Sequence, residues 1–127
     1  MSSHSPSRIQ TYKSDGAIAK GKAVKIGSDS QHVVVAGGNT DPCVGIAQNA
    51  TTGAEQLVEV ALQGGGAKGL AKEQITAGKL LVANADGALE QTNASGDRVI
   101  GLAMESAVAG DIFAVEVVVA TADSADQ

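Results

Sequence analysis

The chain has 127 residues, of which 43% are hydrophobic, a net charge of −5, and only two aromatic side chains, Tyr12 and Phe113. This length fits one domain with one core, built here from small aliphatic side chains. No apolar run approaches the roughly 18 to 20 residues of a membrane span, and the start lacks the apolar stretch of a secretion signal. A single cysteine, Cys43, leaves no internal disulfide and no cysteine cluster for zinc. We therefore expect a soluble protein that is not exported.

Charge is distributed unevenly along the chain. Residues 1–30 carry five basic residues against two acidic ones, whereas residues 31–127 carry four basic residues against twelve acidic ones. A basic entry segment on an acidic body predicts a polarised molecule, with one end suited to an acidic partner surface. The alternative is that the lysines are simply scattered and solvated.

Polar, aperiodic residues at both ends, 1 to about 7 and 121–127, predict flexible tails. Between them, short runs of β-branched residues separated by Gly, Asp and Asn turns predict strands. In chain order these runs are Arg8 to Lys13, Ala23 to Ile26, His32 to Ala36, Cys43 to Ala47, Leu57 to Leu62, Leu80 to Ala83, Ala88 to Gln91, Val99 to Met104 and Ile112 to Ala120. Such closely spaced strands indicate a sandwich or barrel.

Two further segments complete this pattern. Asn84 to Gly87, between two apolar runs, predicts a hairpin turn. Gly64 to Gly69 reads as a flexible linker, and Ala71 to Thr76 after it is the one short helix that we expect. In the last strand, Phe113, Val115, Val117 and Val119 share an apolar face, and the run 117–119 predicts a strand covered on both sides, by the core and by a neighbouring subunit.

The chain contains an internal repeat. Ile18-x-x-Gly21-Lys22 returns as Ile75-x-x-Gly78-Lys79, Val44-Gly45-Ile46-Ala47 returns as Ile100-Gly101-Leu102-Ala103, and Glu59-Val60 returns as Glu116-Val117, at offsets of 56 or 57 residues. Open stacking of repeats generally needs three or more units, so two copies favour β units that close on one another. We expect a mainly β, small β-barrel or β-tulip-like single domain over residues 14–120, with repeat units at about 17–62 and 74–119.

Motifs that carry chemistry are scarce. Gly64-x-Gly66-x-x-Gly69 matches a dinucleotide fingerprint formally, but no long helix and parallel strand follow it. The only histidines are His4 and His32, and Glu59 and Glu116 are best explained as strand-surface residues with a lysine across the strand. We expect no enzyme activity, no cofactor and no metal site. The acidic body and the lack of aromatic stacking groups disfavour nucleic-acid binding.

The repeated phrases, in their order and spacing, carry a resemblance. Val44-Gly45-Ile46-Ala47, Val58-Glu59-Val60-Ala61-Leu62, Ile100-Gly101-Leu102-Ala103 and Ala109-Gly110-Asp111 resemble motifs of the capsid cement or decoration proteins of tailed bacteriophages, over about residues 8–120. The resemblance implies a non-enzymatic protein on the outer capsid surface of the virion, made in the host cytoplasm. It also implies trimers at the three-fold and quasi-three-fold positions of the head, bound to the major capsid protein and reinforcing the shell against internal DNA pressure.

Residues 1–13 are predicted to form a partly flexible arm that extends a capsid sheet by strand addition. The residues expected to bind are Arg8, Ile9, Gln10, Thr11, Tyr12 and Lys13. An alternative reading is a β-clip or barrel module that binds a small ligand or glycan, because Ile75 to Leu81 resembles the Ile-x-x-Gly turn of such modules.

Overall fold

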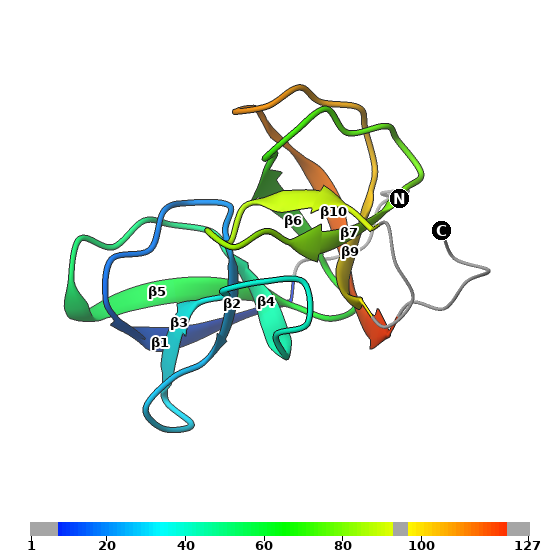
Figure 1. The fold of residues 1–127 in the computed structure, drawn as a ribbon. Helices are drawn as coiled ribbons and strands as arrows, with labels where there is room; N and C mark the ends of the chain where they lie inside the picture. Colours follow the sequence, from blue (N-terminus) through cyan, green and yellow to red (C-terminus); the bar gives the residue numbers. More distant parts are fainter. Residues whose placement is uncertain (1–7, 93–96, 122–127) are drawn as a thin grey trace, which may run out of the picture.

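The computed structural model describes residues 8–92 and 97–121, which form ten strands and no helix (Figure 1). The strands are β1 (Ile9–Asp15), β2 (Ala23–Ile26), β3 (His32–Val35), β4 (Cys43–Ala47), β5 (Ala54–Leu62), β6 (Gly66–Leu70), β7 (Leu80–Ala83), β8 (Leu89–Gln91), β9 (Arg98–Ala103) and β10 (Ile112–Thr121). The mainly β prediction is confirmed, and nine of these strands correspond to predicted runs. Residues 1–7 and 122–127, most of the two predicted tails, lie outside the described residues. Since no helix is present in 8–92 and 97–121, none there is long and apolar enough to cross a membrane.

The first five strands form a closed barrel in the order β1-β3-β2-β4-β5. All neighbours in it are antiparallel except β1 and β3, which are parallel and pair only at Lys13–His32 and Ser14–Val33. The barrel is therefore closed by one short parallel seam.

The last five strands repeat this arrangement. Their order, β6-β10-β9-β7-β8, is the cyclic order of the first barrel with β6 in the place of β1 and β10 in that of β5. A single parallel bridge between Ala71 and Leu89 takes the place of the β1–β3 seam. Strands β1–β5 and strands β6–β10 are therefore two β units that each curl on themselves. Their structural equivalence includes β1 and β6, which lie outside the repeat seen in the sequence.

Matching turns show how the repeated phrases produce this equivalence. Gly21 and Gly78 have φ angles of +90° and +92°, a conformation that favours glycine. Their amides donate to the carbonyls of Ala47 and Ala103 respectively, each at 2.8 Å. In each unit, the turn formed by Ile-x-x-Gly-Lys is therefore hydrogen-bonded to the last residue of the Gly-aliphatic-Ala strand.

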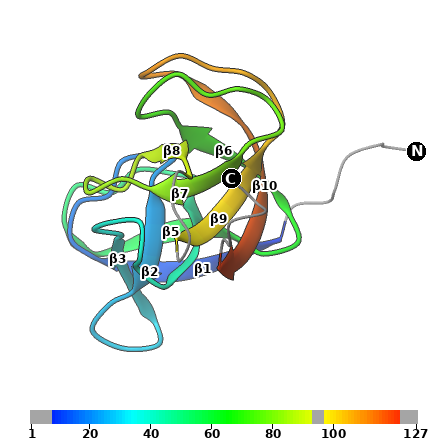
Figure 2. The same ribbon diagram turned by 45° about the vertical axis from the view of Figure 1, so that its right-hand side comes forward.

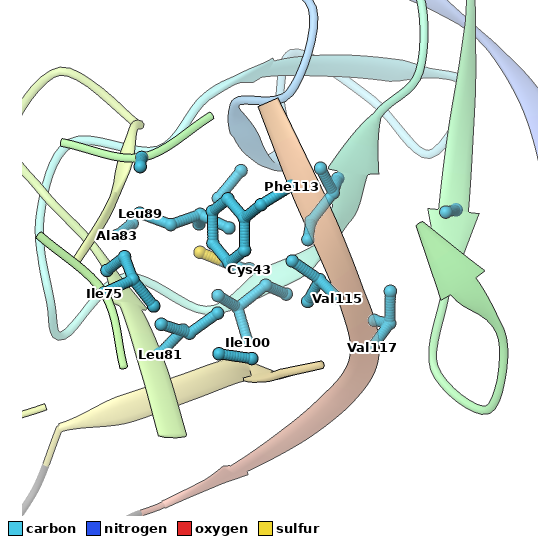
Figure 3. Close-up of a cluster of buried hydrophobic side chains, with 14 of the residues drawn as sticks. Cys43, Ile75, Leu81, Ala83, Leu89, Ile100, Phe113, Val115 and Val117 are labelled. Carbon is cyan, nitrogen blue, oxygen red and sulfur yellow. The ribbon is translucent and has the colours of Figure 1, made fainter. Parts of the chain in front are cut away.

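Two hydrophobic clusters fill the molecule, so the expectation of one core is wrong. The smaller cluster fills the first barrel with Tyr12, Ile18, Val24, Val33, Ala47, Val58 and Val60. The larger one combines second-unit residues with Ala23, Cys43, Ile46 and Ala61 from the first barrel. Phe113 on β10 and Cys43 of β4 both belong to it (Figure 3). The first half of β2 and most of β4 are thus buried on both faces, and the shared cluster joins the two units into one domain.

Two predictions about residues 64–76 are wrong. The expected linker contains β6, where Gly69 is needed for packing because an added Cβ would approach Val115 Cγ2 to 3.0 Å and collide with Leu89. The expected helix does not form because its amides bond to carbonyls of β8 and of the segment between β9 and β10. Ala71, Lys72 and Ile75 donate to the carbonyls of Asp111, Leu89 and Ala107 at 2.7–2.9 Å.

The predicted hairpin at Asn84 to Gly87 is confirmed, and it also contacts the first barrel. The amide of Asn84 donates to the Ala88 carbonyl at 2.7 Å, and Gly87 has a φ of +87°. The Gly87 carbonyl accepts from the amide of Ala23 on β2 at 2.8 Å. The turn therefore packs against the first unit at a position where a side chain at 87 would collide with Val35.

Candidate functional site

The residues predicted to bind a capsid lie in and just before β1, which is a strand of the first barrel. Tyr12 is buried in the barrel interior, whereas Ile9, Gln10, Thr11 and Lys13 are exposed. Residues Ile9–Lys13 are held in place by backbone pairing with β5. Tyr12 also packs in the hydrophobic cluster inside the barrel. The structure thus presents residues 9–13 as a paired strand of the barrel, with residues 1–7 of the predicted arm outside the described residues.

The first half of β1 has an open edge. The carbonyl of Arg8 accepts the Leu62 amide at 2.7 Å, and the Ile9–Ala61 register then directs the backbone groups of Gln10 and Tyr12 towards β5 as well. The N–H and C=O groups of Ile9 and Thr11 point the opposite way, and β3 does not reach them because its pairing begins at Lys13. In Figure 2, β1 runs along the lower side of the barrel and extends beyond the β2–β3 hairpin.

Among the described residues, no hydrogen-bond partner is present for the outward backbone groups of Ile9 and Thr11. By contrast, the exposed edge of β6 is capped. The side-chain amide of Gln48 both donates to the Lys68 carbonyl at 3.2 Å and accepts from the Lys68 amide at 3.1 Å. The β1 edge is therefore the more accessible of the two for pairing with another chain.

Basic side chains border the open edge. Arg8 is exposed, and its guanidinium donates to the Gln63 carbonyl at 3.3 Å. Lys13 Nζ lies 3.9 Å from Glu55 Oε2, an exposed pair that leaves the lysine largely solvated. Both cations therefore remain available to an acidic surface.

Glu55 belongs to a polar cluster that the sequence did not indicate. His32 lies between two carboxylates, with Nδ1 2.7 Å from Asp29 Oδ1 and Nε2 2.7 Å from Glu55 Oε1. Hydrogen bonds first to Asp29 and then to Glu55 raise the pKa of His32, and the bond from His32 lowers the pKa of Asp29. Glu55 is 23 positions from His32, so only the fold brings them together.

An open hollow of about 520 Å³ lies between the start of β4 and the end of β10. It is lined by Arg8, Cys43, Val44, Leu62, Gln63, Gly64 and Val119. Arg8 is the one charged residue in this lining, and burial raises the pKa of the Cys43 thiol to about 11. The hollow thus combines an apolar wall with one cation at its rim.

The remaining candidate residues have structural roles. Glu59 faces Thr11 across the β1–β5 ladder, and Glu116 faces Gly66 and Leu102, so the expected lysine across the strand is absent at both positions. Over residues 8–92 and 97–121, no group of three or more His, Cys, Asp or Glu side chains could hold a metal ion. No metal or cofactor role is assigned to these residues.

The fold is shared with a protein of phage heads. A crystal structure titled "head fiber gp8.5 N base in bacteriophage phi29" superposes with a TM-score of 0.70 at 17% sequence identity, covering 88% of this chain and 94% of that chain. At this identity the similarity shows the fold alone. A search among curated proteins found no match.

Residues 4–121 match the family described as "Phage cement protein". This span is nearly the whole chain, so the chain belongs to the phage cement protein family. The family is one of structural proteins of the phage capsid and is not an enzyme family. The resemblance drawn from the repeated phrases is therefore confirmed, and the chain is assigned to the capsid of the virion.

Proposed function

We propose that this chain is a decoration protein that binds the outer surface of an icosahedral phage head and stabilises it against internal DNA pressure. It is made in the host cytoplasm and joins the head as trimers at three-fold and quasi-three-fold positions, with the major capsid protein as its partner. The observation that carries the proposal is the open edge of β1 at Ile9 and Thr11, bordered by Arg8 and Lys13.

Strand addition at this edge supplies backbone hydrogen bonds without aromatic anchor residues, which the chain almost entirely lacks. Each such bond contributes a net of roughly 0.5–1.5 kcal/mol, so the four outward groups of Ile9 and Thr11 give only weak binding for one chain. A trimer that engages three sites together binds far more tightly, because the second and third contacts become intramolecular. Trimerisation and edge pairing therefore support each other.

Charge favours the same surface. Arg8 and Lys13 lie on or next to β1, and most of the acidic residues lie in the rest of the chain. The two cations at the open half of β1 gain attraction to an acidic shell, and salt screens that attraction. Head binding should therefore weaken as ionic strength rises.

A pair of variants at position 11 tests the edge. Thr11→Pro removes an outward N–H while leaving the bonds to β5, since proline is tolerated where a strand edge faces solvent. Thr11→Ala keeps the backbone and changes only the exposed side chain. Both variants are mixed with expanded heads that lack the protein, and the bound copies per head are counted by quantitative gel analysis after sedimentation.

We expect Thr11→Ala to bind like the natural chain and Thr11→Pro to lose most of its binding while retaining its circular dichroism spectrum and melting temperature. Equal occupancy for the two variants would refute the role of the edge. Electron cryomicroscopy of the same heads tests the rest of the proposal. Density at positions other than the three-fold axes would refute the trimer arrangement, and decorated heads that release DNA at the same temperature as bare heads would refute stabilisation.

A further inference from the structure

The contacts of His32 define its protonation state. Both ring nitrogens lie 2.7 Å from carboxylate oxygens, of Asp29 on one side and Glu55 on the other. An ionised carboxylate can only accept hydrogen bonds, and a histidine donates from both nitrogens only when it is protonated. A neutral ring would place a nitrogen lone pair against one of the two carboxylates, so the geometry fits the imidazolium.

The position of His32 gives these contacts a mechanical role. His32 begins β3 and Glu55 lies near the start of β5, while β1 runs between these two strands. The contact between the two side chains therefore bridges β3 and β5 across β1. It does so beside the short seam that closes the barrel, where β1 and β3 pair only at Lys13–His32 and Ser14–Val33.

Glu55 lies in a bulge of the β1–β5 ladder, where the register shifts between the Lys13–Leu57 and Asp15–Ala54 pairs. Its φ angle is +64°, the one positive value at a non-glycine residue among those that the structure describes. The left-handed region is unfavourable for residues with a Cβ, and the bulge accounts for it here, on the residue whose side chain reaches His32. The carboxylate of Glu55 is held by His32 and, more loosely, by Lys13.

We propose that Asp29, His32 and Glu55 form a pH-sensitive clamp on the seam of the first barrel, closed in mild acid and released in alkali. The clamp depends only on contacts within the first barrel and does not rest on the proposed function. Three charged groups face the His32 ring or its partners: Asp29 on the β2–β3 turn, Glu55 on β5 and Lys13 on β1.

The pKa shifts of His32 and Asp29 determine how the stability of the clamp changes with pH. The pKa of His32 is raised above its ordinary value of 6.5, so the stabilisation is fully present below about pH 6.5 and is lost as the pH rises through the higher folded value. The pKa of Asp29 is lowered from 3.8, so its contribution is present above about pH 4 and is lost only in stronger acid. The clamp is therefore complete between about pH 4 and 6.5.

Proton NMR titration of the His32 ring tests the clamp. The variant His4→Gln leaves one histidine, whose titration can then be followed without overlap. We expect its pKa to lie above 6.5 and to fall when Glu55→Gln removes one carboxylate. Glu59→Gln, which changes an exposed acid on the same strand, is the matched control and should leave the titration unchanged. A His32 pKa at or below 6.5, or an equal shift in both variants, would overturn the proposal.

Hydrogen exchange reports the seam directly. The Lys13 amide donates to the Gln31 carbonyl at 2.8 Å, so its protection measures the closure of β1 against the β2–β3 turn. After correction for intrinsic exchange, protection should fall several-fold as the pH passes through the His32 titration. Glu55→Gly, which relieves the backbone and leaves only the contact between His32 and Asp29, should reduce that pH dependence even if the variant is more stable. Protection that does not change with pH in the natural chain would refute the clamp.

Discussion

Phe113→Ala tests whether the shared hydrophobic cluster joins the two β units. Phe113 is 1% exposed and belongs to the cluster that contains residues of both units. A buried aromatic side chain removes roughly 150–250 Å² from water, worth roughly 4–6 kcal/mol at about 25 cal/mol per Å². Because alanine retains part of this burial, we expect a loss of about 3–5 kcal/mol, in the range of Phe-to-Ala changes in other cores.

Urea unfolding measures this loss. With a slope of about 1.5 kcal/mol per molar urea, the midpoint should fall by roughly 2–3 M. The chain has no tryptophan, so Tyr12 provides the fluorescence, and Tyr12 lies in the other cluster, inside the first barrel. If the shared cluster joins the units, the Tyr12 signal and the circular dichroism signal should shift together in Phe113→Ala.

The neighbouring residue provides the control. Ile112 is 44% exposed on the same strand, so Ile112→Ala should cost less than about 1 kcal/mol. The reasoning fails if Phe113→Ala costs no more than Ile112→Ala. It also fails if the Tyr12 transition stays in place while the circular dichroism transition moves, because the two units would then unfold independently.

Two further predictions concern buried positions. Cys43 is buried, and its thiol has a pKa raised to about 11, so native protein at pH 8 should react with a thiol reagent at least about a hundredfold more slowly than unfolded protein; equal rates would contradict this. Gly87→Ala should cost roughly 2–3 kcal/mol in thermal or urea unfolding, because the residue has a positive φ and its Cβ would collide with Val35. Gly78→Ala has a similar φ and open space around it, so it should cost only about 1 kcal/mol, and an equal cost at both positions would show that contact between the units is unimportant.

The sequence predicted the regular part of the fold because local patterns control it. Short β-branched runs gave nine of the ten strands, and Asn84 to Gly87 gave the hairpin between β7 and β8. The alternating apolar face of β10 appears as buried Phe113, Val115 and Val117, with Val119 packed against the same cluster. These features depend on near neighbours in the chain, which the sequence shows directly.

Local patterns failed where a long-range contact decides the structure. Glycines in β6 resemble a linker until Leu89 and Val115 are packed against Gly69. Ala71 to Thr76 has a helical composition, yet its amides bond to carbonyls of residues far away in the sequence. In both segments the tertiary contact outweighs a weak local preference.

The sequence by itself determined the mainly β class, the internal duplication and the family, because composition, spacing and repeated motifs are written along the chain. Only the tertiary structure decided that each repeat curls into its own five-stranded unit, that β1 keeps an open edge at Ile9 and Thr11, and that His32 meets Asp29 and Glu55. Strand order and side-chain meetings depend on pairing between residues far apart in the chain. The chain adopts the pairing that best buries apolar side chains and satisfies hydrogen bonds over the whole molecule. No single segment of the sequence contains that information.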